Sequence, residues 1–256
     1  MLNNYTLAWS FRNRVTEIQK SMITASNTCP DDVDFVLVDA ASSPETLKQV
    51  KQCAEGLPRT VRICESAYRS SLSQAWNLAM MLTPNRYMIF ASSDVVFKTS
   101  GWFNALAEGL KTSPYVLLQN HGVFGIDKAI IPKIGWFDEQ FGPGAHFDCD
   151  YMIRASEAGI PVKNLPNDGY YVHDEENIQY TERVKDLDPD RLPIGNFANE
   201  RYFMEKWKSG WKGWERLKGT GVDLPHPPTH IKVCERRIPE VDPHPIYTKQ
   251  YAGELC

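Results

Sequence analysis

The sequence lacks an excess of basic residues and lacks any long apolar run. It has 28 lysines and arginines against 32 aspartates and glutamates, for a net charge of −4. Without a global positive field, we expect no binding to nucleic acid. No apolar stretch approaches the roughly 20 residues that cross a bilayer, and no basic segment precedes an apolar run at the start. These absences predict a cytoplasmic protein with neither a signal peptide nor a transmembrane segment.

The sequence also lacks paired cysteines. Its six cysteines form no C-x-x-C pair and no dense framework, which favours reduced thiols over disulfides or structural zinc. The sequence is rich in apolar residues: 42% of its 256 residues are hydrophobic, which is enough for one large core.

Short apolar runs alternate with amphipathic segments over the first two-thirds of the chain, which predicts an α/β fold built from βαβ units. Strands are expected at 6–10, 35–38, 60–64 and 87–91, separated by helices that begin near residues 15, 43 and 71. Further along we expect a helix at 102–110, a strand at 115–118, a short strand and turn at 126–134, a helix at 148–158, and strands at 162–165 and 170–172.

The composition changes near residue 219, after which six prolines disfavour both helix and central strand. The predicted organisation is therefore one α/β domain at 1–218, followed by an extended, proline-rich segment at 219–256.

Several candidate functional side chains follow predicted strands. Asp39 and Asp94 end the second and fourth strands, at the edge where open α/β sheets bind ligands. Asp148 and Asp150 start a helix, where one of them suffices as a cap and the other is available for acid–base chemistry. His173 ends a late strand. Taken singly, a strand-end aspartate is more often a turn or cap, and a lone histidine is more often a surface or core residue.

In their order along the chain, these segments resemble the GT-A-fold glycosyltransferases, specifically the large inverting family 2. Residues 36–42 resemble its V-V-D-N-x-S motif, residues 71–77 its G-x-a-x-a-x-N segment, and residues 90–97 the strand that ends in D-x-D. The most specific stretches are 134–141 and 148–159, which are similar to G-x-F-D-E-x-F followed by E-D-x-D-x-x-x-R. Residues 199–207 resemble a late N-x-x-x-F-x-x-K-W element.

The resemblance implies a GT-A (Rossmann-like) three-layer sandwich with a central mixed, mostly parallel sheet. It also implies transfer of a sugar from a UDP-, GDP- or dTDP-linked donor to a glycan, lipid-linked or protein acceptor. Inversion by direct displacement is expected, with a divalent metal, Mn²⁺ or Mg²⁺, on the diphosphate.

The resemblance also implies roles for individual residues. Asp94 would bind the metal, with His173 as a possible second ligand that favours Mn²⁺, and Asp148 would be the general base. The donor would also be contacted by Asp39, Asn13, Arg14, Ser93 and Asp94. The acceptor would be contacted by Trp136 and Asp150. Trp136 fits a core position equally well, and Asp150 fits a helix cap.

Three positions depart from the family pattern. Ser92 replaces the first carboxylate of D-x-D, Phe147 replaces the glutamate of the E-D pair, and Ser71 replaces a glycine. Loss of two carboxylates leaves open a non-catalytic, carbohydrate-binding descendant of the enzyme. A nucleotidyltransferase of similar topology is a further alternative, against which the lack of a glycine-rich phosphate loop near the first strand counts.

Overall fold

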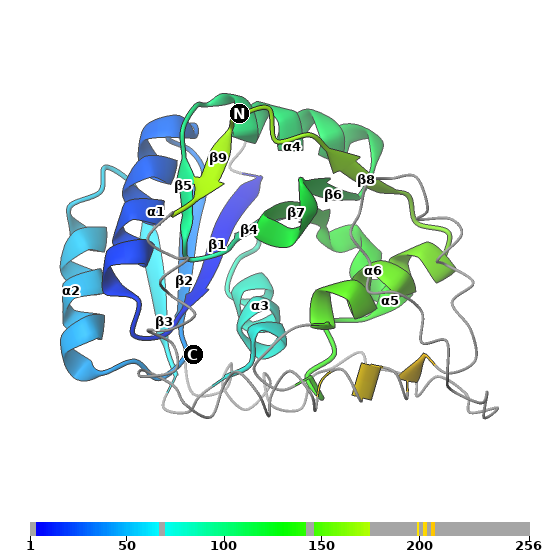
Figure 1. Ribbon diagram of the computed structural model, residues 1–256, viewed down its shortest axis with the longest axis horizontal. Coiled ribbons are helices and arrows are strands. Elements are labelled where there is room, and N and C mark those ends of the chain that lie inside the picture. The colour runs from blue at the N-terminus through cyan, green and yellow to red at the C-terminus, as the bar shows by residue number, and fades with distance from the viewer. Residues whose placement is uncertain are drawn as a thin grey trace.

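The computed structural model describes residues 4–66, 70–141 and 146–174, together with residues 199, 202, 203, 206 and 207. Its centre is a seven-stranded sheet (Figure 1). In sheet order the strands are β3 (Val61–Glu65), β2 (Asp34–Asp39), β1 (Tyr5–Phe11), β4 (Tyr87–Ala91), β7 (Val123–Asp127), β6 (Tyr115–Leu118) and β8 (Val162–Leu165).

The sheet is mixed and mostly parallel, which confirms the predicted fold class. Strands β3, β2, β1 and β4 run parallel, and β6 is parallel to β8. Strand β7 alone runs against its neighbours β4 and β6. Because β1, β2 and β4 are parallel, their carboxyl ends meet at one edge, as the sequence predicted for Asp39 and Asp94.

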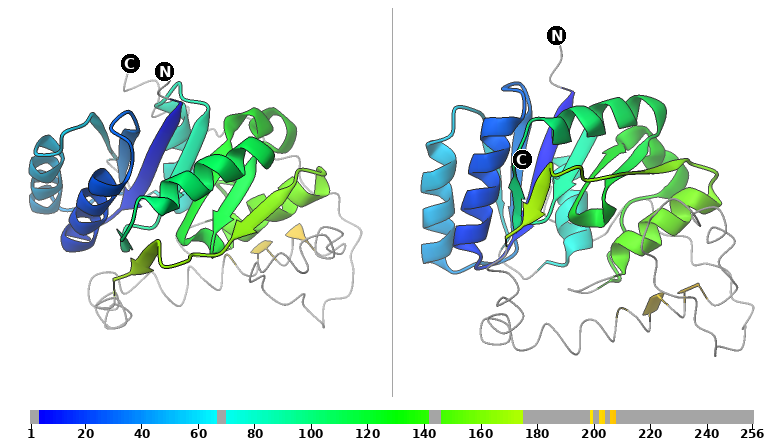
Figure 2. Two further views of the ribbon diagram at one scale, coloured as in Figure 1. Left: turned by 90° about the horizontal axis from the view of Figure 1, so that it is seen from above. Right: turned by 45° about the horizontal axis from the view of Figure 1, so that its top comes forward.

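Helices cover both faces of the sheet and complete three layers (Figure 2). On one face lie α1 (Val15–Thr28), α2 (Pro44–Glu55) and α4 (Gly101–Thr112). On the other lie α3 (Leu72–Met81), α5 (Ile131–Ile134) and α6 (Phe147–Glu157).

Strand alternation supplies both cores. In β1, Leu7 and Trp9 enter the core beneath α1 and α4, whereas Ala8 between them enters the core beneath α3 and α6. Successive side chains of a strand point to opposite faces, so a run buried on both sides is apolar throughout.

A second, two-stranded sheet joins β5 (Val95–Phe97) to β9 (Tyr171–His173). The sequence predicted a strand near 170–172 but did not predict β5 or this pairing. Where a short strand and turn were expected at 126–134, β7 ends at Asp127, and the 3-10 helix η2 (Lys128–Ile130) leads into α5.

None of the described helices is both long and apolar enough to cross a membrane. The predicted boundary near residue 218 and the proline-rich segment 219–256 lie outside the described residues, so the division of the chain remains a prediction.

Candidate active site

Asp39 ends β2 and is almost completely buried. Its carboxylate accepts from the backbone N–H of Ser42, with N···O distances of 3.0 and 3.2 Å. Burial raises the pKa of Asp39 even though these hydrogen bonds lower it. The side chain therefore holds the loop that leads into α2, and it lies at the ligand-binding edge where the sequence placed it.

Asn13 and Arg14 occupy the loop between β1 and α1. Asn13 has a positive φ of 50°, which asparagine tolerates better than most residues. Its N–H donates to Ser42 Oγ at 2.9 Å, and its Oδ1 accepts from the N–H of Ser43 at 2.8 Å. Arg14 Nη1 donates to Ser93 Oγ at 3.0 Å. The loops after β1, β2 and β4 are thus tied together by residues predicted to bind the donor.

Asp94 and His173 lie side by side because β5 pairs with β9. His173 is opposite Val95 in that pairing, and its Nδ1 lies 3.4 Å from Oδ1 of Asp94. Burial alone would raise the pKa of Asp94, but hydrogen bonds from His173 and Ser92 and the charge of Arg14 hold it well below its usual range. Contact with Asp94 raises the pKa of His173.

Asp148 lies in the first turn of α6 and contacts a histidine that the sequence analysis did not single out. His121 Nδ1 is 3.5 Å from Asp148 Oδ2, and its Nε2 is 2.9 Å from the hydroxyl of Tyr115. The other oxygen of Asp148 accepts from the N–H of Cys149 at 2.8 Å. Neither Asp148 nor Asp150 is the N-cap of α6; that position is His146, with a φ of 78° and no side-chain cap.

The 3-10 helix η1 (Asn120–Gly122) connects these two pairs. Its His121 contacts Asp148, and the next residue, Gly122, packs against His173: a Cβ added to Gly122 would lie 2.9 Å from His173 Nε2. The carbonyl of Gly122 accepts from the N–H of Ser92 at 2.9 Å. The Asp94–His173 pair and the Asp148–His121 pair therefore both contact η1 and lie near each other. Nothing in the local sequence around His121 marked it, because its partners come from β6 and α6.

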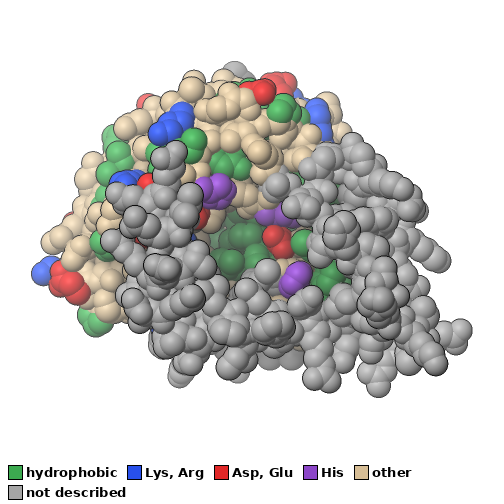
Figure 3. All heavy atoms as spheres, in the orientation of Figure 1, with side chains coloured by type: hydrophobic (Ala, Val, Ile, Leu, Met, Phe, Trp, Pro, Cys, Tyr) green, Lys and Arg blue, Asp and Glu red, His purple; other side chains and the backbone are tan. Residues whose placement is uncertain are grey.

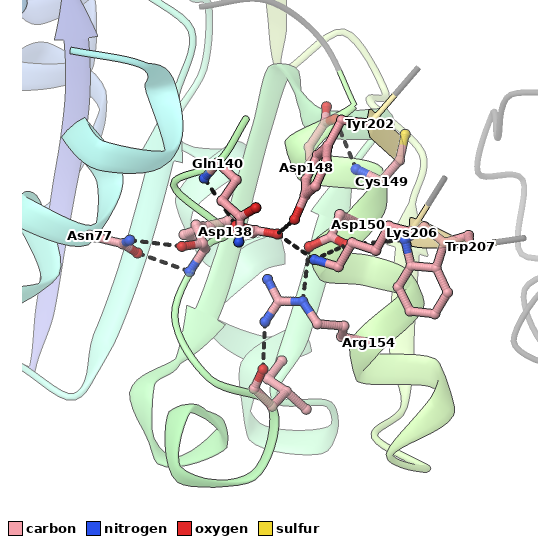
Figure 4. A network of polar contacts seen from close by, with 12 residues as sticks. Asn77, Asp138, Gln140, Asp148, Cys149, Asp150, Arg154, Tyr202, Lys206 and Trp207 are labelled. Carbon is pink, nitrogen blue, oxygen red and sulfur yellow. Dashed lines mark hydrogen bonds and ion pairs between the residues drawn. The ribbon is translucent and has the colours of Figure 1, made fainter. Parts of the chain in front are cut away.

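Asp150 is fully buried in a charged network rather than exposed beside Asp148 (Figure 4). Its carboxylate accepts from Arg154 Nε at 2.9 Å, Lys206 Nζ at 2.7 Å and Trp207 Nε1 at 3.1 Å. Lys206 also reaches Asp138 Oδ2 at 2.5 Å. These contacts attach the late Lys-Trp element to α6 and indicate a structural role, while the acceptor role stays a prediction.

Two of the three departures from the family pattern have a structural explanation. Phe147 is buried against Trp76, with ring centroids 4.8 Å apart, in an aromatic cluster that a glutamate could not join without losing its solvation. Ser71 is the N-cap of α3 and forms a capping box with Gln74. Trp136 is partly buried and packs against the same core. Its stacking on a sugar stays a prediction.

Metal binding at this site would depend on few protein ligands. In the part of the chain that the structure describes, no group of three or more histidine, cysteine, aspartate or glutamate side chains could hold a metal ion. Asp94 and His173 offer one oxygen and one nitrogen close enough together to contact a single ion. This donor set fits a metal that takes its remaining ligands from a bound diphosphate and water.

The space-filling view shows a hollow in this face of the molecule, with hydrophobic side chains on its floor and histidine and acidic side chains around it (Figure 3). A concave surface with a few converging polar groups is the usual form of a small-molecule site.

Several solved structures share this fold. A mannosyltransferase from Pyrobaculum calidifontis, solved with GDP-Man and Mn²⁺, has a TM-score of 0.58 at 15% identity, over 79% of this chain and 70% of that one. S. aureus TarS residues 1–349 has a TM-score of 0.55 at 14% identity, over 79% and 70%. Glucosyl-3-phosphoglycerate synthase from Mycobacterium tuberculosis, solved with Mn²⁺, UDP and phosphoglyceric acid, has a TM-score of 0.55 at 11% identity, over 70% and 73%.

No curated protein matches the sequence. At these identities the structural likeness shows a shared fold. The sequence profile of glycosyl transferase family 2 matches residues 10–153, which is more than half of the chain and runs from the end of β1 through most of α6. The chain therefore belongs to glycosyl transferase family 2 and is an enzyme of that family.

Proposed function

We propose that this enzyme transfers a sugar from a nucleotide-diphosphate sugar to an acceptor hydroxyl with inversion, using Asp94 and His173 as metal ligands and Asp148 as general base. The observation that carries the proposal is the position of η1. Its consecutive residues His121 and Gly122 contact Asp148 and His173 respectively, which supports a single site for the metal ligands and the base.

Asp94 and His173 would hold the divalent ion. The pKa of Asp94 is held low, so its carboxylate is charged and available as a ligand across the neutral range. An imidazole beside a carboxylate favours Mn²⁺ over Mg²⁺. When bound, the ion would stabilise the negative charge that builds on the departing diphosphate. Structural neighbours of this fold were solved with Mn²⁺, which supports the choice of metal.

Asp148 would accept the proton of the acceptor hydroxyl as that oxygen attacks the anomeric carbon. Its side chain keeps 23% of its surface exposed, whereas Asp150, two residues on, is fully buried. A base must be within hydrogen-bond reach of the proton that it removes, which requires such exposure. The bond from the anomeric carbon to the diphosphate oxygen breaks as the new bond forms on the opposite side, and this gives inversion.

The donor nucleotide would lie across the loops after β1, β2 and β4. Asp39 would accept a hydrogen bond from a base N–H, and Arg14, held beside Ser93, would add positive charge next to Asp94 for a diphosphate. Asn13 orders the same loops. The donor nucleotide would be UDP, GDP or dTDP, and the acceptor a glycan, a lipid-linked molecule or a protein. Trp136 would stack on a sugar ring of the acceptor.

Hydrolysis of nucleotide sugars tests the proposal without knowledge of the acceptor. The purified protein is incubated with Mn²⁺ and separate UDP-, GDP- and dTDP-sugars, and release of the nucleoside diphosphate is followed. We expect slow release from one donor class, abolished by Asp148→Asn with donor binding retained, and loss of both donor binding and release with Asp94→Ala.

The matched control is Asp32→Asn, an exposed aspartate just before β2 and so at the opposite edge of the sheet from Asp39. This variant should behave as the parent does. If every donor stays intact and none raises the melting temperature, the proposed function is wrong and a non-catalytic role is favoured.

A further inference from the structure

We infer that His121, backed by Tyr115, is the positioning residue that orients the Asp148 carboxylate for proton transfer. This inference rests on the proposed role of Asp148 as base, and it assigns functions to two residues that no family motif marked. It concerns a chain of three side chains from different elements: Tyr115 on β6, His121 on η1 and Asp148 on α6.

The order of donors and acceptors along this chain follows from Asp148. A charged carboxylate only accepts hydrogen bonds, so the favourable state of the facing Nδ1 of His121 is protonated. In a neutral imidazole, Nε2 must then be the acceptor, and the Tyr115 hydroxyl 2.9 Å away donates to it. Tyr115 therefore selects the tautomer that presents an N–H to Asp148.

The surroundings of His121 keep it neutral. The ring is enclosed by Tyr115 from β6, the ring of Phe124 from β7 at 5.3 Å, and Asp148 from α6. Burial lowers the pKa of His121, and only the Asp148 charge acts against this. An imidazole with one proton, held on one nitrogen by its neighbours, orients a carboxylate without neutralising it.

Both oxygens of Asp148 are thereby fixed. Oδ1 accepts from the N–H of Cys149, and Oδ2 faces His121, so rotation of the carboxylate would break one contact or the other. Each carboxylate oxygen keeps a further lone-pair site for an incoming hydroxyl proton. The preceding residue is Phe147, which is buried among aromatic rings and provides no second acid beside Asp148. In the described structure, the polar side chain of His121 lies beside Asp148.

Two substitutions at residue 121 distinguish orientation of the Asp148 carboxylate from simple filling of the space that the His121 side chain occupies. In His121→Asn the amide nitrogen can occupy the position of Nδ1, and in His121→Gln it can occupy that of Nε2. We expect His121→Gln to keep its contact with Tyr115 but to lower kcat for donor hydrolysis by about 10-fold to 100-fold, part of the 10²–10⁴-fold that a general base supplies. His121→Asn should recover most of that loss, and KM for the donor should stay within about 2-fold in both variants.

Tyr115→Phe tests the tautomer, and Tyr151→Phe is its matched control. Both tyrosines are fully buried and their rings are 5.9 Å apart, but the Tyr151 hydroxyl has no hydrogen-bond partner among the described residues. Removing the Tyr115 hydroxyl should lower kcat by about 3-fold to 30-fold, a fraction of the base's contribution. Removing the Tyr151 hydroxyl should leave kcat unchanged.

Nitrogen NMR of the histidine side chains provides a measurement that does not need turnover. We expect His121 to be the Nδ1–H tautomer from pH 7 to 8, and to lose that preference in Tyr115→Phe and in Asp148→Asn. An Nε2–H tautomer, or an imidazolium in this range, would overturn the inference. So would full kcat in His121→Gln while Asp148→Asn is inactive. If Asp148→Asn is active, Asp148 is not the base. This result distinguishes failure of the proposed function from failure of the inference about His121.

Discussion

Nδ1 of His173 lies 3.4 Å from Oδ1 of Asp94, although the two residues are far apart in the sequence. The small sheet of β5 and β9 creates this proximity, since His173 pairs with Val95, the residue after Asp94.

In the metal-free protein, the Asp94–His173 pair should stabilise the fold in a limited pH range. The pKa of Asp94 is lowered on folding, so its contribution is present above its ordinary value near pH 4 and is lost on acidification. The pKa of His173 is raised, so its contribution is present below about pH 6.5 and is lost as the pH rises through the folded value. The melting-temperature difference between the parent protein and His173→Ala should therefore be largest between about pH 4.5 and 6.5.

Mn²⁺ should stabilise the protein at higher pH than the Asp94–His173 ion pair does, because a metal ligand must be unprotonated. Above about pH 7.5, added Mn²⁺ with a nucleoside diphosphate should raise the melting temperature of the parent protein but not that of Asp94→Ala. Equal stabilisation of both would remove Asp94 from the metal site.

Gly122→Ala should disturb His173 directly. The new Cβ would lie 2.7 Å from the Tyr171 hydroxyl oxygen and 2.9 Å from His173 Nε2, so both side chains, or the backbone of Gly122, must move. We expect a loss of about 1–3 kcal/mol in the free energy of unfolding, as for other overpacked sites, measured by urea denaturation. Metal affinity should fall as well. Gly56→Ala is the control, because its Cβ would meet no atom closer than 3.4 Å.

Phe147→Glu would restore the family's acidic pair in sequence, yet we expect it to reduce activity. Phe147 is only 4% exposed and packs on Trp76, so the substitution places a carboxylate among aromatic rings. The free energy of unfolding should fall by at least about 3 kcal/mol, whereas Phe147→Leu should cost about 1 kcal/mol. Increased donor hydrolysis by a stable Phe147→Glu protein would show that the missing acid limits the enzyme.

Lys206→Met should be strongly destabilising. The Lys206 ammonium is fully buried between Asp138 and Asp150, and its charge lowers the pKa of Asp138, which burial alone would raise. Removing one partner of a buried ion pair typically costs about 3–5 kcal/mol, and here the buried Asp138 would lose its cation while Asp150 would keep Arg154. Chemical denaturation provides the measurement. Lys111→Met, which removes an exposed lysine paired with Glu108, should leave stability unchanged.

Local patterns in the sequence determined most of the sheet and one edge of the site. Apolar runs predicted β1, β2, β4 and β6 because these strands are buried on both faces, and the edge strands β3 and β8 were also predicted although they are only partly buried. Asp39 and Asp94 were found at strand ends because a polar residue closes such a run. Ordered family motifs then supplied the fold and the enzyme class, which the family match confirms.

Only the tertiary structure decided which of these side chains share a site. The Asp94–His173 contact depends on strand pairing between distant segments, and the Asp148–His121 contact joins α6 to a turn that carries no motif. The burial of Asp150 depends on Lys206 and Trp207, which approach from much later in the chain. Strand and cap signals act within a few residues, whereas burial and pairing of charges are set by segments that meet only when the chain folds.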